Sequence, residues 1–124
     1  MRTARALLLT AAALLLGPLA VVCAPSKLGQ SYALNKLVTP NGDGFNDTFI
    51  FRCYNPRDAA IDARIYDVSG REAGSMRLRS GGLADFYYTY EWDPNSGGRS
   101  PGGIYIYQIS VEKNVYKGTI VVIR

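Results

Sequence analysis

Oxygen-bearing side chains gather in one short loop, residues 39–47, which reads Thr39-Pro-Asn-Gly-Asp-Gly-Phe-Asn-Asp47. Calcium prefers six to eight oxygen ligands and accepts carboxylates, side-chain amides and backbone carbonyls. Aligned with a calcium-binding EF loop, Asn41, Asp43, the Phe45 carbonyl and Asp47 fall at four of the ligand positions. These four residues are therefore the candidate metal ligands of this chain.

The same alignment leaves two ligand positions unfilled. Thr39 stands where an EF loop begins with aspartate, and Ile50 stands where the bidentate glutamate is needed. Additional oxygens would have to come from another part of the chain, such as Asp93 or Asn95. If calcium binds here, we expect it to pin the first strands in a structural role.

The alternative interpretation of this loop is a tight turn that needs no metal. Gly42 and Gly44 can adopt positive φ angles at no steric cost. Asn41, Asp43 and Asn46 belong to the residue types whose side chains hydrogen-bond to the nearby backbone in turns. Both interpretations predict a loop held in one conformation.

The residues needed for most catalytic machinery are missing from the sequence. The chain has no histidine, which removes the commonest general base and the usual catalytic triads. It has neither a cluster of cysteine and histidine metal ligands nor a glycine-rich phosphate loop between a strand and a helix. The sequence therefore predicts a protein that is not an enzyme.

The N-terminus has the plan of a secretory signal peptide. Arg2 and Arg5 precede an apolar run at residues 6–16, and small residues near Ala24 follow a Gly-Pro break. We expect residues 1–26 to be the leader, although a retained anchor is an alternative. Cleavage would lower the formal net charge of +4 by two. No basic stripe remains, so nucleic-acid binding is not expected.

The two cysteines allow three outcomes. If cleavage removes Cys23, Cys53 is left alone. If Cys23 is retained in an oxidising compartment, a bridge to Cys53 is conceivable. Cys23 could instead carry a lipid, but Ala20 and Val22 fit a lipoprotein signal poorly. Contact with a membrane is expected only with such a lipid or a retained leader.

After a polar lead-in at residues 27–36, residues 37–124 read as one all-β domain. Short apolar runs with aromatic and β-branched residues are separated by turn residues every eight to twelve positions, which is typical of a β-sandwich. No run shows a helical period, so little helix is expected. The predicted strands are residues 37–38, 47–53, 61–68, 71–78, 86–92, 104–111 and 115–123, with a turn at 79–82.

The aromatic residues indicate where the core lies. Trp92 follows Tyr88 and Tyr90 at a spacing of two, so all three could share one face of a strand. Tyr105 and Tyr107 repeat that spacing in a later strand. Core packing explains Tyr90, Trp92 and this second pair better than a ligand site does, because a small sandwich needs large apolar side chains.

Three signatures occur in a fixed order along the chain. They are Val38-Thr-Pro-Asn-Gly-Asp-Gly-Phe-Asn-Asp-Thr-Phe49, then Ile65-Tyr-Asp-Val-Ser-Gly-Arg71, then Trp92-Asp93 followed by Pro101-Gly-Gly-Ile-Tyr-Ile-Tyr107 and Tyr116-Lys-Gly-Thr-Ile-Val-Val-Ile-Arg124. Together they resemble the gliding-motility-associated C-terminal domain, a type B sorting domain of the type IX secretion system. They are also similar to the Ig-like domain of flagellar hook-capping proteins. Pro94 departs from this pattern, since the family usually has glycine there.

The resemblance implies an Ig-like antiparallel β-sandwich of about seven strands that the export machinery recognises. It implies that Lys117, Gly118 and Arg124, at the end of the chain, belong to the recognised region. The family module usually follows a long cargo, whereas here only the leader and the lead-in precede it.

Two functions follow as hypotheses. The first is an exported, non-enzymatic module that is secreted or held at the cell surface and acts by binding the secretion machinery or surface proteins. The second is a structural subunit or adaptor of an extracellular appendage, which would self-associate by accepting a strand at an open sheet edge. The lead-in is a candidate donor of such a strand.

Overall fold

The computed structural model describes residues 29–82 and 85–124. The expected leader, its cleavage site and Cys23 lie outside the described residues. Within them the chain forms nine strands and no helix, which confirms the predicted all-β class. The strands are β1 (Tyr32–Ala33), β2 (Leu37–Val38), β3 (Phe49–Tyr54), β4 (Ile61–Asp67), β5 (Glu72–Ser75), β6 (Arg77–Gly81), β7 (Tyr87–Trp92), β8 (Gly103–Val111) and β9 (Asn114–Val122).

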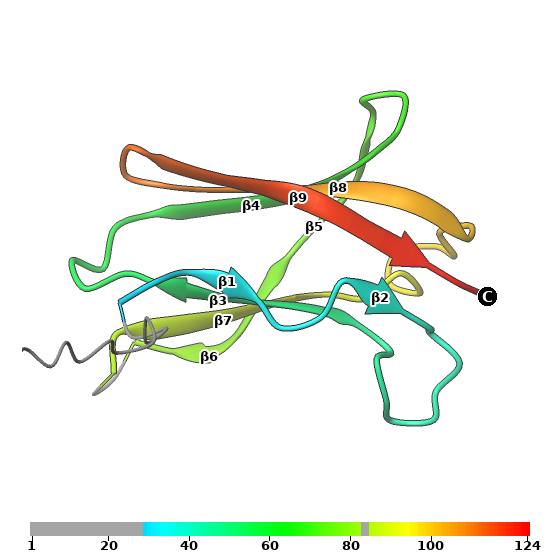
Figure 1. The fold of residues 1–124 in the computed structure, drawn as a ribbon, viewed down its shortest axis with the longest axis horizontal. Helices are drawn as coiled ribbons and strands as arrows, with labels where there is room; N and C mark the ends of the chain where they lie inside the picture. The colour runs from blue at the N-terminus through cyan, green and yellow to red at the C-terminus, as the bar shows by residue number, and fades with distance from the viewer. Residues whose placement is uncertain (1–28, 83–84) are drawn as a thin grey trace, which may run out of the picture.

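The strands form two sheets packed face to face, as Figure 1 shows. One sheet has the order β1-β3-β7-β6, and the other has the order β2-β9-β8-β4-β5. In immunoglobulin lettering these orders are A-B-E-D and A′-G-F-C-C′, so the Ig-like prediction is confirmed. The first strand is split between the sheets: β1 pairs antiparallel with β3, whereas β2 pairs parallel with β9.

The structure differs from the sequence analysis in three places. Residues 71–78 were expected to form one strand, but the chain changes sheets at Met76, between β5 and β6. Met76 is buried there, and its backbone N–H donates to the carbonyl of Ala63 at 3.0 Å. The expected turn at 79–82 is mostly strand, because β6 continues to Gly81. Residues 27–36 contain β1, a strand that their composition did not indicate.

The core lies between the sheets and follows the period of two. Phe49, Phe51 and Cys53 alternate inward along β3, and Tyr105 and Tyr107 do so along β8. The rings of Phe49 and Tyr107 stack across the layers, with centroids 5.0 Å apart. Because these residues are contributed by both sheets, the core can form only when the two sheets meet.

The aromatic strand β7 faces the core with one side and the outer surface of its sheet with the other. Trp92, Tyr90 and Tyr88 lie opposite the inward residues of β3, and Trp92 is only 3% exposed. Tyr87 points to the other side of the sheet and is also buried. There the Arg52 guanidinium lies 4.6 Å from the Tyr87 ring centroid, a cation–π contact.

Candidate functional site

The loop of residues 39–47 is held together by the carboxylate of Asp47. One of its oxygens accepts a hydrogen bond from the Gly42 N–H at 2.8 Å, and the other accepts from the Gly44 N–H at 2.7 Å. Both glycines have positive φ, at 80° and 86°, which only glycine adopts freely. Asp47 therefore serves as the internal acceptor around which the loop turns.

The other candidate metal ligands also bond within the loop. Asn41 Oδ1 accepts from the Asp43 N–H at 3.1 Å, and Asp43 Oδ1 accepts from the Phe45 N–H at 2.9 Å. The Phe45 carbonyl accepts from the Thr39 hydroxyl at 3.4 Å. Each predicted ligand residue thus directs an oxygen at a local donor, which is the hydrogen-bonded turn proposed as the alternative.

The two residues suggested as additional calcium ligands make other contacts in this structure. The two suggested extra ligands supply no oxygen to the loop: Asn95 directs its amide nitrogen at the Pro40 carbonyl, 3.3 Å away, and Asp93 Oδ1 accepts from the Asn95 N–H at 2.9 Å. Across residues 29–82 and 85–124, no group of three or more acidic, histidine or cysteine side chains could hold a metal ion. The calcium site stays a prediction, whereas the hydrogen bonds of the tight turn are present in the structure.

The predicted sorting residues lie on or beside β9, and the structure gives them three different surroundings. Lys117 is exposed on the outer side of its sheet. Gly118 is covered by the ring of Tyr107, its partner in the β8–β9 register. The guanidinium of Arg124 donates to the Ser100 carbonyl at 2.7 Å and to the Pro94 carbonyl at 3.4 Å. Arg124 therefore ties the chain end to the loop that follows β7.

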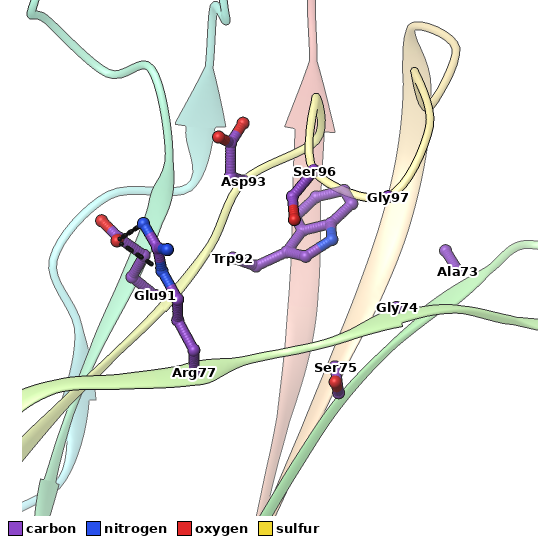
Figure 2. A pocket seen from close by; sticks show the side chains of 9 residues that line it. All are labelled: Ala73, Gly74, Ser75, Arg77, Glu91, Trp92, Asp93, Ser96 and Gly97. Atoms are coloured by element: carbon purple, nitrogen blue, oxygen red, sulfur yellow. Dashed lines mark hydrogen bonds and ion pairs between the residues drawn. The ribbon is translucent and has the colours of Figure 1, made fainter.

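A hollow of about 370 Å³ lies beside β7, and Figure 2 shows its lining. Trp92 forms one wall, but the indole is almost entirely covered and offers no open face for stacking. Glu91 turns away from the indole and accepts two hydrogen bonds from Arg77, at 2.7 and 3.1 Å. The positive charge of Arg77 therefore already balances the negative charge of the Glu91 carboxylate.

The pairing of Glu91 was missed by the sequence analysis. Thr48 also donates to it at 3.2 Å, and Arg79 adds an ion pair at 3.7 Å. Glu91 is 9% exposed, so these partners compensate the cost of burying its charge. No sequence signal indicates this cluster, because β6 and β7 are brought together only by sheet pairing.

The Cys53 side chain is fully buried and forms no disulfide within residues 29–82 and 85–124. Burial raises its pKa, and a weak contact from the Ser31 hydroxyl at 3.9 Å opposes that rise. A thiol with a raised pKa in an apolar environment is a poor nucleophile. Cys53 therefore serves as a packing residue rather than a reactive one.

Comparison with known proteins places this fold in a family. No curated protein matches the sequence. No helix in residues 29–82 and 85–124 has the length and apolar character needed to cross a membrane. The family model of the CHU_C type IX secretion signal domain matches residues 32–122, which take in all nine strands. That family is one of secretion signals and not of enzymes. The chain belongs to the CHU_C type IX secretion signal domain family.

Proposed function

We propose that this chain is an exported, non-enzymatic module that the type IX secretion machinery recognises and that then acts by binding proteins at the cell surface or in the medium. The observation that carries the proposal is the family match, which runs from β1 to the end of β9. In this proposal residues 1–26 act first, as a cleaved signal peptide that takes the chain across the inner membrane.

The state of the polar groups supports a binding role without catalysis. Glu91 is neutralised by two arginines, and Asp47 is occupied by backbone amides. The buried Cys53 thiol cannot reach a substrate. A general base or nucleophile needs an accessible group with a matched pKa. The groups that would be the natural candidates here are used to hold the fold.

Within the recognised region, we assign different roles to the three predicted residues. Lys117 is the exposed contact, because its side chain is exposed and has no ion pair among the described residues. Gly118 and Arg124 support that surface indirectly. Gly118 leaves room for the Tyr107 ring, and Arg124 holds the neighbouring loop by a hydrogen bond.

The proposal is tested by locating the full-length protein in its native host. The amounts in periplasm, washed cell surface and medium are compared between the wild-type strain and a strain that lacks the type IX outer-membrane translocon. We expect the protein to leave the periplasm only in the wild type. Equal export from both strains would show that the chain does not use this route.

A further inference from the structure

The last strand leaves most of one edge of its sheet open. On one side, β9 pairs with β8 along its whole length, from Asn114 to Val122. On the other side, β2 pairs with it only at Val121 and Val122. Residues 114–120 therefore have no strand beside them on that side within the described part of the chain.

The hydrogen-bonding groups on this edge can be identified from the part that is paired. The N–H groups of Val121 and Ile123 donate toward β2, to the carbonyls of residues 36 and 38 at 2.8 and 2.9 Å. Because backbone direction alternates along a strand, the N–H and C=O groups of Val115, Lys117 and Thr119 face the same side. All three residues are exposed, and within the described residues no hydrogen bond to these groups is found.

The open edge of β9 is regular, unlike the edges formed by β5 and β6. The β4–β5 pairing shifts register at Ile65 and Tyr66, and the β6–β7 pairing shifts between Leu78 and Ser80. The β8–β9 pairing shows no shift over nine residue pairs. Irregularities of this kind are how proteins prevent unwanted strand addition. On the open part of β9, Lys117 is the remaining obstacle of that type.

We propose that residues 115–119 of β9 accept an extended strand from a partner protein, with an acidic side chain of that strand placed against Lys117. Lys117 faces Gln108 across the ladder. The next residue in that row, Arg64, already pairs with Asp62 and Glu72. The Lys117 charge is therefore available to a carboxylate on the edge side. This inference rests on the proposed function and names the surface through which recognition occurs.

A second copy of this chain is a poor occupant of the same edge. Two copies could pair antiparallel through Val115, Lys117 and Thr119 of each chain. In that register Lys117 of one copy would lie directly opposite Lys117 of the other. Like charges directly opposite each other destabilise a strand pair. The same lysine thus disfavours self-pairing and favours an acidic strand.

Strand addition can be measured on the exported protein purified from its host. The probe is a peptide of about nine residues, the length of a short strand, that alternates threonine and valine around a central glutamate. We expect it to slow amide exchange at Val115, Lys117 and Thr119, and the same peptide with a central lysine to slow it much less. Unchanged exchange at these amides, equal effects of both peptides, or a dimer in sedimentation measurements that protects them without peptide would overturn the proposal.

A pair of variants extends the test to export. Thr119→Pro removes an edge-facing N–H without breaking a bond to β8, and proline is tolerated at such positions. Thr119→Val keeps that N–H and is the matched control. We expect exported protein to fall about tenfold for the proline variant, the scale of one lost hydrogen bond plus a steric block, and to change little for the valine variant. Normal export of a folded proline variant would overturn the inference.

A second substitution covers the case in which the proline variant does not fold. Lys117→Glu would repel an acidic strand, whereas Lys117→Arg keeps the charge. We expect export to fall for the first and persist for the second, and equal export of both would overturn the inference. Failure of the proposed function looks different: wild-type export would then be independent of the translocon, and the exchange experiment would still decide whether the edge accepts a strand.

Discussion

The aromatic ring of Tyr107 lies across Gly118, its direct partner in the antiparallel β8–β9 pairing. A Cβ atom at position 118 would lie closer to the ring and hydroxyl of Tyr107 than real Cβ contacts allow. The ring is fixed from the opposite sheet, where Phe49 and Phe51 lie with centroids 5.0 and 5.6 Å away. The glycine therefore makes room for an aromatic contact that joins the two sheets.

Replacing that glycine should destabilise the domain. Gly118→Ala forces the Tyr107 ring away from its partners, and overpacking of this kind costs about 1–3 kcal/mol of unfolding free energy. Chemical denaturation of wild type and variant measures the difference. In a Tyr107→Leu background the same alanine should cost much less, because the ring is gone. An equal cost in both backgrounds would show that the cost has another source.

The Asp47 carboxylate should stabilise the loop of residues 39–47 more than an added metal ion does. Asp47→Ala leaves the N–H groups of Gly42 and Gly44 without their acceptor. We expect a loss of about 1–2 kcal/mol of unfolding free energy, the scale of two partly exposed hydrogen bonds. Asp47→Asn keeps one acceptor oxygen and should lose less.

Calcium provides a separate check on the same loop. Because its oxygens already accept local hydrogen bonds, we expect the same thermal unfolding midpoint in calcium and in chelator. A ligand that binds only the folded state raises that midpoint as its concentration increases. A clear rise with calcium that disappears in Asp47→Ala would show instead that the loop binds calcium.

The turn after β4 should loosen in acid. The Ser69 hydroxyl and the backbone N–H groups of Ser69 and Arg71 all donate to Asp67 Oδ1, at 2.5, 2.9 and 3.0 Å. The Ser69 hydroxyl is the main cause that lowers the pKa of Asp67 in the folded state, opposed by a smaller desolvation effect.

A lowered carboxyl pKa means that Asp67 contributes stability above its unfolded value, about 3.9, and loses it as the pH falls through the lower folded value. Amide exchange at Ser69 and Arg71 should therefore become faster below about pH 4, after correction for the intrinsic exchange rate. Asp67→Asn removes the titrating group and should abolish this pH dependence. Exchange that still varies in that variant would assign the effect to another group.

Cys53 should react only when the domain opens. Its side chain is fully buried, and burial raises the pKa of its thiol. In the exported protein we expect very slow alkylation under native conditions and rapid alkylation in denaturant. A thiol that remains blocked in denaturant and becomes available after reduction would instead indicate the bridge to Cys23.

Arg124 should act on the loop at residues 93–102 rather than on a partner. Arg124→Ala removes the hydrogen bonds to the Ser100 and Pro94 carbonyls, so we expect faster amide exchange in that loop. The expected loss of unfolding free energy is about 0.5–1.5 kcal/mol. Arg124→Lys keeps the charge but cannot reproduce both bonds of the planar guanidinium. Equal amide exchange in wild type, Arg124→Ala and Arg124→Lys would show that Arg124 does not hold this loop. Arg124 would then be a candidate contact for a partner protein.

The sequence by itself determined the fold class and the family, because both depend on local patterns. Alternating apolar residues and closely spaced turn residues are visible in the chain and are sufficient for an all-β sandwich. The glycines and acidic side chains of residues 39–47 likewise act on their own backbone, so their spacing was sufficient to propose the hydrogen-bonded turn.

Only the tertiary structure decided what depends on pairing between distant segments. Residues 71–78 are extended on both sides of Met76, so their composition could not show that the chain changes sheets there. Nothing in the sequence distinguishes Gly118 from the other glycines, because only the β8–β9 register shows that Tyr107 lies opposite it. The open edge of β9 exists because the chain joins that side of β9 only at β2, while β1, which precedes β2, pairs with β3 in the other sheet. Long-range strand pairing sets each of these features, and the period of two within one strand carries no information about which strand will lie beside it.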